Sequence, residues 1–569
     1  MTGDTGAAQS QGAVQNGRRS IIVWAAGASL CVLGLYVGLM FDFFGKYHPY
    51  SDDAGVILHS CTPWFSAGRW SDWFTQGWAR YAVNYPNWGP FGNNTLKPVV
   101  NLVFCLEGLF TPQFGNSTFL IMSYLAPAIT VFALVFVFNR LGRATAALSF
   151  VLALCVGFSA LWIGSLVNAV DMTNTLALMF SAIVLALLPT YDLRPPPFLQ
   201  VGLVMFQLMA VFSHETALVL SPVCVVLVFA LSSSRPRIRY LWPFAAAPIL
   251  WVGVRLFVLQ AHSGVYALSA SGLAHAKVWG YWFLSVLVPI DVQGLWMARG
   301  LASMSHASLR IPIIVAVATL LAVNLIFICV VVLTILRRRD KRSLLLGLAF
   351  VLASAPHLTT AFDLYGARFA GLSMTVGILV CLLLFPNWTR VLMAVACILL
   401  VAEVLYSFTG LIERKTVAAA ACVAATQYSA YVHEAVNQTK PNRVVVVNDR
   451  FGQFGVPAMV RLNAWPHQDF DVVVIDNLSL GDYPAGNLTI QRLATNISIA
   501  CTVGGDSTMS FLGADRADFD IENQGFKYDL RAGTVESPGA IVAVAPLSDK
   551  KTLILGYRPD GTLIRPVLF

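Results

Sequence analysis

Long apolar runs separated by short polar segments recur along the chain from Ile21 to Ile412. A helix needs roughly 20 apolar residues to cross a bilayer, so these runs predict membrane-spanning helices. Apolar residues make up 57% of the chain and charged residues only 12%, about half the charged fraction of soluble domains. The fold class is therefore an α-helical polytopic membrane protein. We expect about eleven spans, near residues 21–44, 116–138, 144–166, 174–188, 198–212, 216–231, 240–259, 311–336, 343–358, 369–384 and 391–412.

Arginine and lysine cluster in short segments between these runs. Arg18 and Arg19 precede the first run, and the basic stretch 337–342 follows the eighth. Because cytoplasmic loops carry the excess of basic residues, we expect both segments and the N-terminus to be cytoplasmic. Residues 1–17 are polar, without an apolar core, and we expect a disordered cytoplasmic tail. The net charge of +8 is thus a topology signal, and we expect no nucleic-acid partner.

Beyond Glu413 the composition changes to that of a soluble domain. Two β-branched runs, 443–449 and 471–476, end in polar residues and are typical of buried parallel strands. Residues 540–544 and 552–555 are also strand-like. We expect residues 18–412 to form the transmembrane domain and residues 413–569 a small extracytoplasmic α/β domain. Arg414 and Lys415 oppose this orientation, because basic residues after the last span favour a cytoplasmic end.

Cysteine usage does not indicate a metal or disulfide framework. Six of the ten cysteines fall inside apolar runs, where a thiol behaves as a small apolar group. We expect no disulfide framework and no zinc site.

On this topology the remaining ionisable residues gather on the outer side, at helix ends or in outer loops 45–97 and 262–310. They are Asp52, Asp53, Asp171, His214, Glu215, Arg255, His262, His357, Asp363 and Arg368. Ionisable groups at membrane depth are costly and usually face a cavity or a partner. The pattern favours one outward polar cavity in which an acid or base works beside an anion such as phosphate.

Several short motifs follow one another in a recognisable order. They are Asp52-Asp53 after the first span, Lys97-Pro98, Ser213-His214-Glu215, Val254-Arg255-Leu256 and Ala367-Arg368-Phe369. This order resembles the GT-C superfamily of polytopic glycosyltransferases, which includes protein O-mannosyltransferases and lipid A aminoarabinose transferases. The sequence departs from the family pattern where Lys97 replaces Arg, His214 replaces Lys and Phe369 replaces Tyr.

The resemblance implies inverting transfer of a sugar from a polyprenyl-phosphate donor to a lipid, glycan or protein acceptor outside the cytoplasm, in a bacterial inner membrane. Asp52 or Asp53 would be the general base, and by analogy with the family we favour Asp52. The implied substrate-binding residues are Lys97, Asp171, His214, Glu215, Arg255 and Arg368. Cations would stabilise the leaving phosphate, best through an arginine fork. We expect no metal or cofactor, and membrane lipids as surroundings.

Each of these residues also has a structural interpretation. Asp171 suits an N-cap for a helix starting at Met172, and His214-Glu215 suits a polar break between two short helices. Arg255 and Arg368 suit snorkelling anchors. Two other functions compete. A secondary transporter or flippase predicts polar groups near the bilayer midplane and in broken helices. A non-catalytic envelope scaffold predicts that the outer acids tolerate replacement.

Overall fold

The structure is a computed structural model that divides into two compact units. Unit 1 comprises Met1–Gly45, Asn94–Val103 and Phe110–Ala419, and unit 2 comprises Lys46–Asn93, Phe104–Leu109 and Ala420–Phe569. The described residues are 5–49, 97–111, 115–188, 195–232, 241–258, 310–359, 366–447, 460, 471–475, 487–492, 496–503, 527–531, 539–546, 551–557 and 562–569. Asp52, Asp53, His262 and Asp363, with most of both predicted outer loops, lie outside them.

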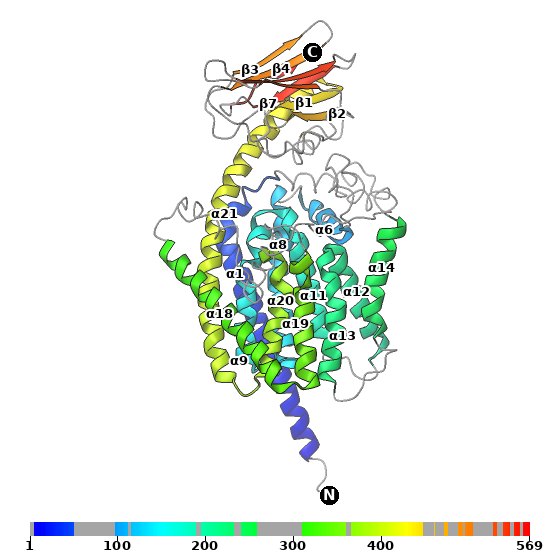
Figure 1. Cartoon of the computed structure of the whole chain (residues 1–569), viewed down its shortest axis with the longest axis vertical. Helices are drawn as coiled ribbons and strands as arrows, with labels where there is room; N and C mark the ends of the chain where they lie inside the picture. The colour runs from blue at the N-terminus through cyan, green and yellow to red at the C-terminus, as the bar shows by residue number, and fades with distance from the viewer. Residues whose placement is uncertain are drawn as a thin grey trace. The chain divides into compact units, whose positions relative to one another are not determined.

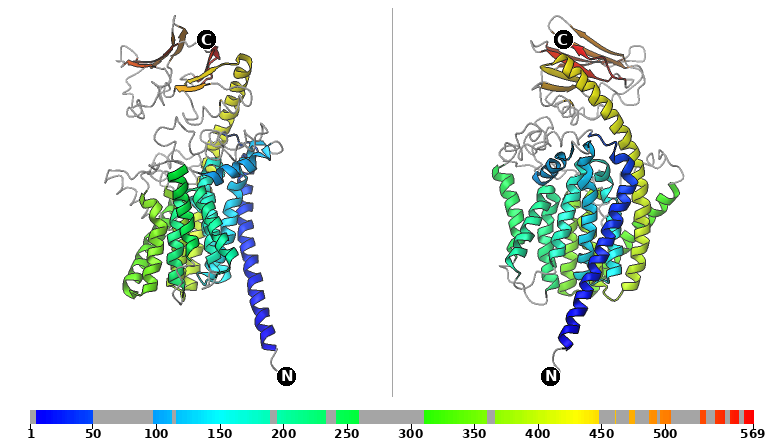
Figure 2. Two further views of the ribbon diagram at one scale, coloured as in Figure 1. Left: turned by 90° about the vertical axis from the view of Figure 1, so that its right-hand side faces the viewer. Right: turned by 180° about the vertical axis from the view of Figure 1, so that it is seen from behind.

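The long helices of unit 1 pack side by side, and successive long helices run in opposite directions (Figure 1, Figure 2). The first half contains α1 (Thr5–Phe44), α6 (Pro98–Gly108, which enters unit 2), η3 (Gly115–Leu120), α8 (Ile121–Arg140), α9 (Ala146–Gly157), η4 (Ala160–Trp162), α10 (Ile163–Val167), η5 (Ala169–Asp171) and α11 (Met172–Leu187). The second half contains α12 (Pro197–Ser213), η7 (Glu215–Val219), α13 (Leu220–Leu231), α14 (Trp242–Gly253), η9 (Val254–Val258), α18 (Arg310–Arg338), α19 (Lys341–Thr359), α20 (Gly366–Leu384) and α21 (Thr389–Thr439, which enters unit 2).

Five described segments are long and apolar enough to cross a membrane. They are Arg19–Phe44, Gly115–Arg140, Ala146–Val167, Arg310–Arg338 and Thr389–Thr439. Their outward faces carry large apolar side chains such as Phe41, Ile311 and Val401, which water would disfavour and lipid accepts. The chain is an integral membrane protein. The count of about eleven spans stays a prediction, because the other apolar helices are shorter.

Two helices extend beyond the predicted ends. Helix α1 begins at Thr5, inside the segment expected to be disordered, and α21 continues to Thr439 rather than ending near Ile412. The segment that follows Ile412 is rich in alanine and has no glycine or proline before Pro441. Alanine has the highest helix propensity, so nothing local ends the helix where its apolar run ends.

Three interruptions lie at the same end of unit 1. Between α9 and α11 the chain forms η4, α10 and η5, and between α12 and α13 it forms the 3₁₀ turn η7. Helix α14 continues into the π-helical turn η9. Such irregular backbone leaves polar groups that a regular helix would satisfy internally. This end of the unit therefore combines non-helical backbone with ionisable side chains.

The described residues of unit 2 form two four-stranded sheets. The first has the order β2-β1-β7-β8, in which β1 (Arg443–Val447) pairs in parallel with both β2 (Asp471–Ile475) and β7 (Thr552–Gly556), and β8 (Val567–Leu568) is antiparallel to β7. The parallel strands predicted within residues 443–449 and 471–476 are confirmed for Arg443–Val447 and Asp471–Ile475. The second sheet is antiparallel, with the order β3 (Asn487–Arg492), β4 (Asn496–Val503), β6 (Gly539–Pro546) and β5 (Lys527–Arg531).

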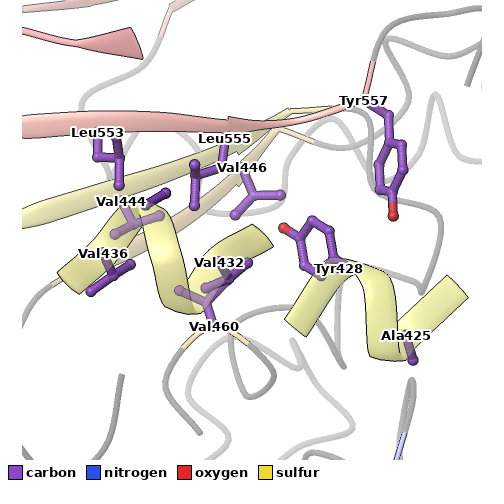
Figure 3. Packing of buried hydrophobic residues seen from close by; sticks show 11 residues of the cluster. Ala425, Tyr428, Val432, Val436, Val444, Val446, Val460, Leu553, Leu555 and Tyr557 are labelled. Atoms are coloured by element: carbon purple, nitrogen blue, oxygen red, sulfur yellow. The ribbon is translucent and has the colours of Figure 1, made fainter. Parts of the chain in front are cut away.

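The core of unit 2 lies between the first sheet and the last turns of α21, as Figure 3 shows. Val432 and Val436 of the helix face Val444 of β1 and Leu553 of β7, and all four are buried. Tyr431 donates a hydrogen bond from its hydroxyl to the Ile564 carbonyl at 2.9 Å. The helix thus covers one face of the sheet with apolar side chains and is also tied to it by a polar contact.

Candidate active site

The two ends of unit 1 carry different sets of ionisable residues. One end, called here the basic end, holds the turns that follow α8, α18 and α20. The described charged residues of these turns are Arg140, Arg143, Arg337, Arg338, Arg339, Asp340, Lys341, Arg342 and Arg390. The opposite end, called here the mixed end, holds the last turn of α1, the turns around η5, η7 and η9, and the start of α20. Among the described residues of unit 1, acids, histidine and cations occur together only at the mixed end.

The acid at the basic end has a structural role. Asp340 accepts hydrogen bonds from the Ser343 backbone N–H at 2.9 Å and from the Ser343 hydroxyl at 2.8 Å. These bonds cap the start of α19 and hold the pKa of the Asp340 carboxyl below its ordinary value.

Asp171 is buried at the mixed end, where η5 meets α11. It occupies the N-cap position of α11, yet its side chain forms no capping hydrogen bond. The carboxylate instead lies over Gly164 of α10: a Cβ at that glycine would stand 2.4 Å from Asp171 Oδ2. The N-cap interpretation of this side chain is therefore wrong, and Gly164 leaves the space that the carboxylate occupies.

Three uncharged polar residues near this end were not singled out from the sequence. Asn174 and Thr175 lie one turn after Asp171 on the same face of α11, and Asn101 lies one turn after Lys97 in α6. Asn101 and Thr175 are buried. The Asn101 amide, the Asn174 carbonyl oxygen and the Thr175 hydroxyl have no hydrogen-bond partner in the structure. Such groups are rare in native proteins, and here they leave hydrogen-bonding capacity that a polar partner would satisfy.

His214 and Glu215 form the break between α12 and α13 that the sequence predicted. His214 is 1% exposed, and its Nδ1 accepts a hydrogen bond from the Thr216 backbone N–H at 3.2 Å, capping η7. Because Nδ1 accepts, the ring proton belongs on Nε2 and the imidazole is neutral. The expected cationic role of His214 is therefore not favoured. Glu215 Oε2 lies 3.8 Å from Nδ1, too far for a hydrogen bond.

Packing brings several predicted residues to one region of the mixed end. The turn η7, with His214 and Glu215, packs against α11 and α19. Helix α20 runs in the same direction as α11, with Gly371 against Leu178. Arg368 lies three residues before Gly371, and Thr175 lies three residues before Leu178. Because the two helices run in the same direction, the backbones of Arg368 and Thr175 lie at the same height along them. Arg255 belongs to η9 and Lys97 directly precedes α6, whereas Asp52 and Asp53 lie outside the described residues.

One cysteine departs from expectation. Cys105, near the end of α6, is disulfide-bonded, while the cysteines described as free include those inside the apolar helices, such as Cys155 and Cys224.

A further acid lies away from the mixed end. Glu403 of α21 is 0% exposed, and neither carboxyl oxygen has a hydrogen-bond partner. It is the only ionisable residue other than cysteine and tyrosine within the predicted span 391–412, and that isolation in an apolar run was the signal that could have identified it.

Comparisons with known proteins add little to this geometry. No protein-family model matches the chain, and no curated protein matches it. Among solved structures, the chain is similar to the crystal structure of ArnT from Cupriavidus metallidurans bound to undecaprenyl phosphate, at 10% identity and a TM-score of 0.43, over 91% of this chain and 98% of that chain. At this identity and TM-score the likeness does not assign a family or a reaction.

Proposed function

We propose that the protein is a membrane glycosyltransferase that moves a sugar from a polyprenyl-phosphate carrier to an acceptor at the mixed end of unit 1. The observation that carries the proposal is the set of unpartnered buried polar groups there, Asn101, Asn174 and Thr175. Leaving such groups unsatisfied costs about 1–3 kcal/mol each. A ligand that offers several hydroxyls, as a sugar does, would supply the missing hydrogen bonds.

The charged residues of the proposed site suit the phosphate and the attacking hydroxyl. In our proposal Asp52 or Asp53 accepts the acceptor's proton as its oxygen attacks the anomeric carbon, which a positioned base accelerates about 10²–10⁴-fold. Lys97, Arg255 and Arg368 stabilise the leaving phosphate as its negative charge grows. Asp171 and Glu215 orient the sugar by accepting hydrogen bonds. His214, being neutral, donates from Nε2 instead of acting as a cation.

Two independent features support a mixed end that faces out of the cytoplasm. The basic residues at the opposite end follow the charge bias of cytoplasmic loops. The disulfide at Cys105 belongs to an oxidising compartment. A lipid carrier suits this orientation, because its chain stays in the bilayer while its sugar reaches the outer surface.

One observation favours a second candidate, a secondary transporter or flippase. Glu403 is a buried acid inside a span, and the helices near η5, η7 and η9 are broken, as in many transporters. The broken segments, however, lie at the mixed end rather than beside Glu403. A transporter would move a substrate without consuming a sugar donor, so the two functions predict different products.

Mass spectrometry of envelope glycans and lipids tests the proposal, comparing cells with the gene, without it, and with Asp52→Asn or Asp53→Asn. We expect the deletion to remove one sugar from one acceptor, and at least one of the Asn variants to do the same while the protein remains at normal abundance in the membrane. Full restoration by both single variants would refute the base assignment. An unchanged set of glycosylated molecules in the deletion strain would refute the transferase.

A further inference from the structure

Glu403 lies deep within the apolar part of α21. It follows Arg390 by 13 residues and precedes Glu413 by 10, which at 1.5 Å per residue places it about 20 Å and about 15 Å from these charged positions along the helix axis. Both separations are large fractions of a bilayer core about 30 Å thick. The long flexible side chain of a lysine snorkels from such a depth, whereas a glutamate side chain does not reach the surface.

The side chain of Glu403 faces other helices rather than lipid. On α21 the neighbouring inward positions Ala402, Tyr406 and Ser407 are buried, whereas the alternate positions Val401 and Leu405 are 61% and 42% exposed. The inward face meets α9, where the Cys155 thiol donates to the Ala396 carbonyl at 3.3 Å, and α10, where Ile163 contacts Gly410. Glu403 is therefore enclosed in a helix seam.

The polar groups around Glu403 leave it unpaired. Its carboxyl is close enough to influence two titratable groups electrostatically, the Tyr36 hydroxyl of α1 and the Cys155 thiol of α9. The Tyr36 hydroxyl donates to the Gly157 carbonyl at 2.7 Å, so its proton is not available for a hydrogen bond to Glu403. Ser407, one turn along α21, also has no hydrogen-bond partner. No lysine, arginine or histidine pairs with Glu403 in the part of the chain that the structure describes.

We propose that Glu403 is a proton-binding site inside the membrane, occupied by a proton while α21 is packed against α1 and α9. An ionised carboxylate without a cation or hydrogen-bond donor is strongly disfavoured in apolar surroundings. The neutral acid fits the seam. Loss of the proton would force the seam to open to water or to admit a cation, so opening of these helices and proton release are linked.

Labelling with a carbodiimide tests the site without any assay of activity. A carboxylic acid adds across the reagent, with its oxygen bonding to the central carbon and its proton passing to nitrogen, so ionised carboxylates react poorly. An ordinary glutamate, with a pKa of about 4.3, is protonated at pH 7 in roughly one molecule in 500. The experiment uses purified full-length protein in lipid nanodiscs and the apolar reagent dicyclohexylcarbodiimide at pH 7. By mass spectrometry we expect Glu403 to form the adduct at least about 100-fold faster than an ordinary, ionised glutamate would.

Two variants and a cation control complete the experiment. Glu403→Gln should remove the adduct and keep the thermal unfolding midpoint at or above the wild-type value at pH 8, because the amide is a neutral isostere. Glu413→Gln, on the same helix, should leave the Glu403 adduct unchanged. Absence of the adduct in folded wild-type protein would overturn the proposal. So would suppression of labelling by Na⁺ or K⁺ at pH 7, which would identify a cation as the occupant, or a large loss of stability in Glu403→Gln.

Discussion

Substitution of Gly164 by alanine should displace the Asp171 carboxylate. The added Cβ would stand 2.4 Å from Asp171 Oδ2, 3.2 Å from its Cγ and 3.5 Å from its Cβ. Ordinary contacts begin near 3.4 Å, so the carboxylate oxygen must move by about 1 Å while the Asp171 Cβ can stay in place. Removal of the carboxylate should therefore remove the clash.

The energetic consequence follows from this geometry. Overpacking of a buried site costs about 1–3 kcal/mol, partly offset by the gain of about 1 kcal/mol when alanine replaces glycine in a helix. In an Asp171→Ala background the nearest of these three atoms that remains is Cβ of residue 171, at an ordinary contact distance of 3.5 Å. Only the stabilisation from the higher helix propensity of alanine then remains. We expect a coupling of about 1–3 kcal/mol between the two positions.

Thermal unfolding of the four proteins in detergent measures this coupling, namely wild type, Gly164→Ala, Asp171→Ala and the double variant. Gly202→Ala in α12 is the matched control, because a Cβ there meets nothing within 4 Å. Equal destabilisation by Gly164→Ala in both backgrounds would refute the reasoning. If Asp171 contacts the sugar, Gly164→Ala should also lower turnover about 100-fold, since a 1 Å misplacement has an effect of that order.

Two histidines give the remaining predictions. His214→Asn keeps an acceptor for the η7 cap, so its thermal unfolding midpoint should stay unchanged, but sugar transfer should be lost because the variant lacks Nε2–H. His214→Ala should lose both stability and transfer. Burial lowers the pKa of His48, outweighing its hydrogen bond to the Pro49 carbonyl. As the pH falls below about 6.5, His48 therefore takes up a proton more readily in the unfolded chain than in the folded protein, which favours unfolding. The thermal unfolding midpoint should decrease from pH 7 to pH 5, and this decrease should be smaller in His48→Gln.

The helices and the first parallel strand pair could be predicted because their signals are local. A run of apolar residues long enough to cross a bilayer has few alternatives to a helix, and β-branched runs ending in polar residues indicated β1 and β2. The end of α21 could not be predicted from hydropathy. Its last turns are held by packing of residues such as Val432 against β1 and β7, a contact between segments far apart in the sequence.

Among the candidate site residues, only those that are ionisable and stand within apolar sequence could be predicted. Asp171, His214 and Glu215 stand out in apolar sequence, so their placement at the mixed end could be anticipated. Asn174 and Thr175 resemble ordinary polar positions of a helix, and their significance depends on the absence of hydrogen-bond partners in three dimensions. Gly164 has meaning only because the Asp171 carboxylate lies over it.

The part of the opposing topology signal that comes from Lys415 has a structural explanation. Lys415 forms an ion pair with Asp42 of α1, with Nζ 2.6 Å from Oδ1, and donates to the Leu39 carbonyl at 2.9 Å. The positive-inside bias reflects basic residues that resist transfer across the membrane. The charge of a lysine that pairs with an acid and a helix carbonyl is partly neutralised, so such a lysine contributes less to the positive-inside bias. The five basic residues within 337–342 at the basic end therefore carry more weight in that bias than Lys415 does.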